Sequence, residues 1–155
     1  LDSNTNSATT VRMEITTLHL AIISKQVSIV ARIIEHLRDD NTNAENIKDV
    51  FTAKTKTLFS GDDANILSHD VRSMDGMNCF HLSCKYSPEC LSILLQFLRR
   101  KGLIKHIPIL LEEKDADIQN TPLHVAATLP NTSVLRLEYS IVILGKHHHL
   151  TTILH

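Results

Sequence analysis

The chain has 155 residues, 43% of them hydrophobic and 21% charged, which excludes a wholly disordered protein and indicates one folded domain. Sixteen basic and seventeen acidic side chains leave a formal net charge of -1 without a long run of one sign, which argues against direct binding of nucleic acid. The apolar stretches are shorter than the roughly 20 residues of a membrane-spanning helix, so no membrane contact is expected.

The N-terminal segment, residues 1–13, is polar and is predicted to be a disordered leader. It lacks the basic start and the apolar run of a signal peptide. Its first residue is Leu rather than Met, so we expect a trimmed chain or a fragment of a longer protein.

The first predicted helical pair begins in the string ITTLHLAI, residues 15–22. The Leu18-His19 pair is followed by the small residue Ala21, which would allow another helix to approach closely. A second helix is predicted downstream because apolar residues recur at helical spacing. These residues are Ile29, Val30, Ile33 and Ile34.

Residues 39–73 separate this pair from the next and have two interpretations. The turn-rich strings RDDNTNAEN and SGDDAN favour a long insertion that carries one short helix around residues 46–58. The alternative is a hidden degenerate repeat, since four apolar residues could form an amphipathic helix. These are Ile47, Val50, Phe51 and Leu58.

The second unit is MNCFHLSCKYSPECLSILL, residues 77–95, preceded by a predicted turn at Asp75-Gly76. Phe80 and His81 take the place of Leu-His, and Ser83 takes the place of Ala21. Leu91, Leu94 and Leu95 give the second helix its apolar spacing. The three cysteines of this unit lack Cys-x-x-Cys spacing, so we expect reduced thiols. They are Cys79, Cys84 and Cys90.

The third unit is NTPLHVAA, residues 120–127, in which Pro122 suits the first turn of a helix. A turn and a second helix with Val134, Leu135 and Leu137 are predicted to follow. The chain then ends in a partial fourth copy, TTILH, residues 151–155. A terminal unit without a polar cap tends to self-associate, so we expect association through this end.

The Leu-His string, or a variant of it, occurs four times along the chain. His19, His81, His124 and His155 occupy equivalent places, separated by 62, 43 and 31 residues. The last interval fits the ankyrin period of about 33 residues, the middle one is longer by about ten, and the first by about 29. The chain therefore resembles the ankyrin-repeat family, whose signature is T-P-L-H-x-A.

The resemblance implies an all-α solenoid of stacked helix-turn-helix units, with about three full repeats and a partial fourth. It would form a single domain over residues 14–155, with the long insertion around 39–73. The residues that carry the signature are Leu18, His19, Ala21, Phe80, His81, Ser83, Thr121, Pro122, Leu123, His124 and Ala126. Leu123 is expected to be buried between units.

The histidines have a structural and a chemical interpretation. By resemblance, each imidazole hydrogen-bonds the backbone between units, and we favour this over catalysis or over a zinc site of His81 with the cysteines. The run His147-His148-His149 is interpreted as an exposed linker rather than a metal site. No phosphate loop, G-x-S-x-G or His-Glu-x-x-His motif occurs, so neither an enzyme nor a cofactor is predicted.

Two strings narrow the resemblance to one group. LHLAII, residues 18–23, and HLSCKYSPECLSILL, residues 81–95, are similar to IkappaB proteins and the ankyrin half of NF-kappaB precursors. This implies a cytoplasmic inhibitor or nuclear cofactor that grips a Rel-homology transcription factor. The chain departs from that group in having fewer repeats and no acidic tail. Ser3 and Ser7 keep part of the group's phosphorylated degradation motif, although a polar leader explains them more simply.

The exposed positions of a solenoid are its hairpin tips and concave face, which suit the binding of another protein. Ile118, Gln119 and Asn120 are candidate binding residues by location. Two alternatives stay open. One is a generic ankyrin adaptor, associated with a ubiquitin ligase or a channel, and the other is a metal-dependent enzyme that uses histidines.

Overall fold

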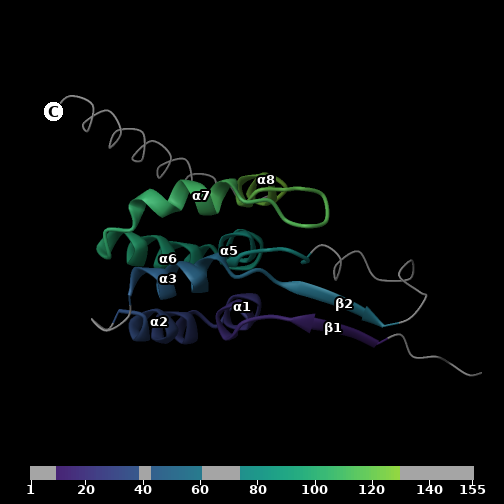
Figure 1. Cartoon of the computed structure of the whole chain (residues 1–155), viewed down its shortest axis with the longest axis horizontal. Coiled ribbons are helices and arrows are strands. Elements are labelled where there is room, and N and C mark those ends of the chain that lie inside the picture. The colour runs from purple at the N-terminus through teal and green to yellow at the C-terminus, as the bar shows by residue number, and fades with distance from the viewer. Residues whose placement is uncertain (1–9, 39–42, 61–73, 130–155) are drawn as a thin grey trace, which may run out of the picture.

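The computed structural model describes residues 10–38, 43–60 and 74–129, which are mostly helical (Figure 1). The elements in chain order are β1 (Thr10–Glu14), α1 (Thr17–Ile23), α2 (Val27–His36), α3 (Ala44–Thr52), β2 (Lys56–Ser60), α5 (Cys79–Tyr86), α6 (Pro88–Arg100), the 3-10 helix η1 (Ile104–His106), α7 (Ile107–Glu112) and α8 (Pro122–Ala127). The predicted helical class is confirmed for most of the described chain. The two strands form a small sheet that the sequence did not indicate.

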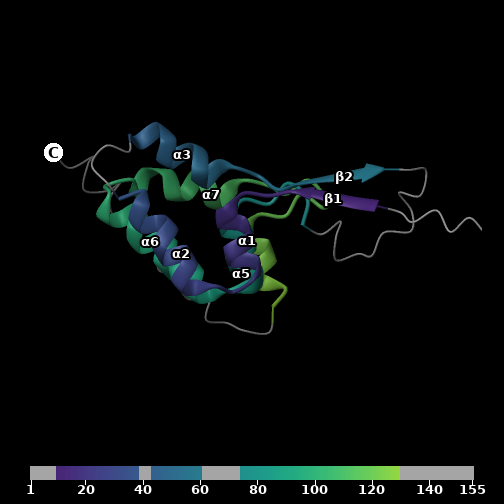
Figure 2. The same ribbon diagram turned by 90° about the horizontal axis from the view of Figure 1, so that it is seen from below.

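The helices lie in successive layers (Figure 1). Helix α1 packs against α5 and α5 against α8, while α2 packs against α6. The view from below shows α2 over α6 and α1 over α5, with α3 and α7 beside them (Figure 2). The predicted helical pairs therefore stack in register, the first pair on the second.

The three helices that begin at a Leu-His or Phe-His string have the same N-terminal cap. The cap side chain accepts a hydrogen bond from the backbone N–H of the third helical residue, which is a histidine each time. The histidine Nδ1 in turn accepts from the cap backbone N–H, at 3.3, 3.3 and 3.2 Å. The pairs are Thr16 with His19, Asn78 with His81, and Thr121 with His124. This is a capping box in which His replaces the usual Glu or Gln, and it satisfies two orphan donors per helix.

The small residues two positions after each histidine lie on helices that pack in series, α1 against α5 and α5 against α8. Ala21, Ser83 and Ala126 are all buried. Their burial is compatible with the expected close approach of the helices, because a larger side chain there would need more space.

Helix α3 is tied to the second layer by aromatic packing. Phe51 stacks on Phe97 of α6, with ring centroids 5.9 Å apart and planes 6° apart, and its centroid lies 6.2 Å from that of Phe80 of α5. Ile47, one helical turn before Phe51, is also buried. Burial of each such side chain stabilises the fold by about 2 kcal/mol.

The segment predicted as an insertion contains more ordered structure than expected. A single helix was expected around residues 46–58, but α3 ends at Thr52 and an extended Ala53 leads into β2. A third helix also follows the second pair, since η1 and α7 lie between α6 and the loop before α8.

Strand β1 begins at Thr10, inside the segment predicted to be a disordered leader. It pairs with β2 in antiparallel fashion, with Arg12 opposite Leu58 and Met13 opposite Thr57. The pairing partner is remote in sequence, so the composition of residues 1–13 alone could not indicate this strand.

Candidate functional site

Extended segments and loops gather at one end of the layers, beside the starts of α1, α5 and α8 (Figure 1). We call this region the hairpin edge and define it as β1, β2, residues 74–78 and residues 113–121. Thr55 N donates to Met77 O at 2.9 Å and Gly76 N donates to Thr55 O at 2.8 Å. Thr57 N donates to the Asp75 carboxylate at 2.7 Å, so the predicted turn at Asp75-Gly76 is held against the start of β2.

The second loop of the hairpin edge is organised around the buried side chain of Asp115. Its Oδ1 accepts hydrogen bonds from the backbone N–H groups of Ile118 and Asn120, at 3.2 and 3.1 Å. Asp115 N donates to Asn120 O at 2.8 Å, which closes the loop. Ala116 N donates to Asp75 O at 3.0 Å and so joins this loop to the first. These hydrogen bonds hold the loop backbone in place, although its tip is exposed.

His81 links the second helical pair to the loop before α8. Its Nδ1 accepts from the Asn78 backbone, which leaves the proton on Nε2, and Nε2 donates to Asn120 O at 3.0 Å. The side chain is fully buried, and burial lowers the pKa of His81. The expectation that a histidine hydrogen-bonds backbone between units is confirmed here.

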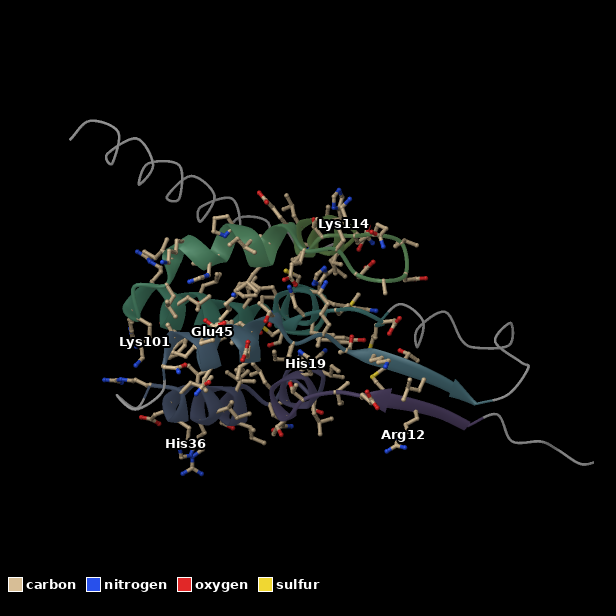
Figure 3. All side chains as sticks on the ribbon, viewed as in Figure 1. Arg12, His19, His36, Glu45, Lys101 and Lys114 are labelled. Carbon is tan, nitrogen blue, oxygen red and sulfur yellow. The ribbon has the colours of Figure 1, made fainter. Side chains whose placement is uncertain are left out.

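The other two histidines of the series differ from His81. His19 is fully buried inside the stack (Figure 3), and within the described residues its Nε2 has no hydrogen-bond partner. Burial lowers the pKa of His19, and the polar backbone of Ala53 raises that pKa by a smaller amount. His124 is exposed although its helix is capped in the same way. Its outward position follows from its place in the last described layer.

Leu123 corrects one prediction. It was expected to be buried between units, but 46% of its surface is exposed. Its counterpart in the second layer, Phe80, is fully buried. Within the described residues, α8 has a layer on one side only, which is why the prediction was wrong.

The candidate binding residues of the loop separate into two kinds. Ile118 is 65% exposed, and Gln119 is also exposed. The backbone of Gln119 has a φ of 60°, in the left-handed region. Asn120 is half-buried, and its carbonyl accepts from both His81 and Asp115. Ile118 and Gln119 can contact a partner, whereas Asn120 holds the loop in place. The other predicted sites, Ser3, Ser7, His147–His149 and His155, lie outside the described residues.

The cysteines do not form a metal centre with His81. Cys79, Cys84 and Cys90 are each buried and unbridged. Nowhere in the described ranges do three His, Cys, Asp or Glu side chains converge as metal ligands. Burial raises the pKa of the Cys79 thiol, and it also raises the pKa of Cys90. Both thiols are therefore poor nucleophiles at neutral pH.

Sequence reasoning missed residues that join the layers at the hairpin edge. Asn78 caps α5, and its amide also donates to Leu110 O at 3.1 Å and to Glu113 Oε2 at 3.0 Å. Lys54 lies 3.8 Å from the same Glu113 carboxylate and donates to Lys114 O, so it joins α3 to the loop after α7. Asn78 could have been found, because it stands three residues before His81 as Thr16 stands before His19.

Comparisons of the chain with protein-family models, with curated proteins and with solved structures gave no match. Across the described ranges, none of the helices has the length and apolar character needed to cross a membrane.

Proposed function

We propose that this protein is an ankyrin-type repeat module that binds another protein and has no catalytic role. The proposal depends chiefly on the three identically capped Leu-His or Phe-His helix starts, which lie on helices that pack one on the next. The hydrogen bond from His81 to Asn120 then ties one layer to the loop of the next, as in a repeat stack. Such stacks present long exposed surfaces and are used for recognition.

The hairpin edge is the surface that we propose for the main partner. Its exposed apolar residue, Ile118, stands on a loop whose backbone Asp115 holds in place. An apolar side chain on a preorganised loop loses little entropy on binding, which is typical of residues that dominate an interface.

The partner that we propose is a Rel-homology transcription factor, restrained by this chain in the cytoplasm or bound by it as a cofactor in the nucleus. The two IkappaB-like strings support this proposal by resemblance. Most of their apolar residues, including Leu18, Leu82 and Leu91, are buried. Because buried residues cannot contact a partner, the two strings support the repeat architecture directly. They support the Rel-homology partner only through the resemblance of that architecture.

A direct titration of the folded chain with a purified Rel-homology dimer tests the partner. We expect Ile118→Asp to weaken binding at least about tenfold, because a charge would replace an apolar contact at the interface. Ile109→Asp is the matched control, since Ile109 is 57% exposed on α7, away from the loop tip. It should bind as the original chain does.

Absence of binding by a chain with native circular dichroism would overturn the Rel proposal. Recovery of ligase or channel subunits from cell extract, with the same sensitivity to Ile118→Asp, would instead favour the generic adaptor. Equal loss with Ile109→Asp would move the interface away from the hairpin edge.

A further inference from the structure

A second surface lies between α2 and α6, the two outer helices, at the end of the layers opposite the hairpin edge (Figure 1). It is a cleft of about 760 Å³, which we call the outer cleft. Its volume lies in the range of about 300–1,000 Å³ that is typical of ligand sites.

The rim of the outer cleft is basic. Among the described residues that line it, Arg38, Arg100 and Lys101 are cationic and Glu35 supplies a carboxylate. None of the three cations has an ion-pair partner in the described part of the chain. Lys101 Nζ donates to Arg38 O at 2.6 Å, which brings the end of α6 next to the end of α2 (Figure 3). The charges therefore meet in one place although they come from separate helices.

The C-terminal ends of α2 and α6 favour nearby cations through the helix dipole. The helix dipole explains why each helix carries cations at its own C-terminal end. It does not explain why the cations of both helices line the same cleft. Arg99 and Arg100 also line an adjoining hollow of about 410 Å³, which extends the positive region along α6. The described residues that line the two hollows therefore include more cations than carboxylates, which favours an anionic group there.

The floor of the outer cleft is apolar. Ile34 and Phe97 form it from the two helices, and Ile93 lies partly exposed above the core. A free phosphate or a nucleic-acid backbone would leave this floor without a matching group. A peptide with carboxylates on both sides of an apolar side chain matches the rim and the floor together.

We propose that the outer cleft binds an acidic segment of a protein, with an apolar side chain on Ile93 and Phe97 and carboxylates paired with Arg38 and Arg100. The inference takes from the proposed function only that the chain recognises proteins. Because the cleft and the hairpin edge lie at opposite ends of the layers, they can be occupied at the same time.

The test is an anisotropy titration of the whole chain with a labelled peptide of about ten residues, Glu and Asp around one central Leu. We expect binding that weakens with salt, and a loss of about tenfold or more with Arg100→Glu or Arg38→Glu. Arg12→Glu is the charge-matched control, because Arg12 is exposed on β1 at the far end of the molecule (Figure 3). A peptide with Ser in place of Leu should bind several-fold more weakly.

Three results would overturn the proposal. These are equal losses with Arg12→Glu and Arg100→Glu, equal affinity for the Leu and Ser peptides, and tighter binding of single-stranded nucleic acid of the same charge. Absence of peptide binding together with an Ile118-dependent Rel complex would refute the outer cleft alone. Peptide binding without any Rel complex would refute the named partner alone.

Discussion

The first and second helical pairs follow one plan but differ in what they bury. Counted from their caps, Leu20 of α1 corresponds to Leu82 of α5, yet Leu20 is 53% exposed and Leu82 is fully buried. The second helices repeat the difference, since Ile29 of α2 is 45% exposed and its counterpart Cys90 is fully buried. In the described chain the second pair has a layer on both sides, and the first has a layer on one side. A repeat position is therefore buried only where a neighbouring layer covers it.

The largest difference in stability is expected when a charge is placed at Leu82 and, for comparison, at Leu20. Leu82→Asp would bury an unpaired carboxylate and should cost about 4 kcal/mol or more of unfolding free energy, enough to unfold a marginal domain. Leu20→Asp should change the stability by less than about 0.5 kcal/mol because Leu20 is exposed.

Urea denaturation followed by circular dichroism measures both variants. Similar losses for the two would show that a further layer covers Leu20 in solution. A stable Leu82→Asp variant would contradict the stacking of α5 between α1 and α8.

A smaller effect is expected at two glycines that share one backbone conformation in different surroundings. Gly76 and Gly102 have φ of 70° and 69°. A Cβ at Gly76 would lie 2.6 Å from Ala116 N in the second loop, whereas a Cβ at Gly102 would meet nothing within 4 Å. We expect Gly76→Ala to destabilise by about 3 kcal/mol and Gly102→Ala by about 1 kcal/mol.

Thermal melting of the two glycine variants isolates the contact between the loops, since both variants carry the same backbone strain. Equal shifts of the melting temperature would mean that the loops at Gly76 and Ala116 are not in contact.

The smallest effect is expected from pH. Burial lowers the pKa of His81 and His19 below the ordinary value of 6.5, so the unfolded chain takes up protons before the folded chain does. Stability should be highest above pH 6.5 and should fall as the pH decreases below that value, until the folded histidines are themselves protonated. Chemical denaturation at pH 7.5 and at pH 5.5 measures the change.

His81→Asn should be less stable at neutral pH and should show a shallower dependence on pH. A pH dependence as steep as that of the original chain would exclude His81 as a source of the effect.

Much of the helical organisation could be predicted from local pattern. The strings around His19, His81 and His124 predicted three helix starts, and Pro122 predicted the first residue of α8. The small residues at Ala21, Ser83 and Ala126 are all buried, on helices that pack against one another. These features depend on residues a few positions apart, so sequence spacing reveals them.

The hairpin edge was less predictable because its contacts join distant parts of the chain. Thr55 meets Met77, Asp75 meets Ala116, and Asn78 meets Glu113, and no local period marks such pairs. The strand at Thr10–Glu14 was missed for the same reason, since its partner β2 begins at Lys56.

Local patterns in the sequence predict where α1, α5 and α8 begin and which of their faces are apolar, because capping and helical spacing involve residues only a few positions apart. Which of those faces are covered depends on how the helices pack, as the contrast between Leu20 and Leu82 shows. The packing of the helices also decided that cations from the ends of α2 and α6 share one cleft. Burial and charge density depend on neighbours from remote segments, and only the packed layers supply those neighbours.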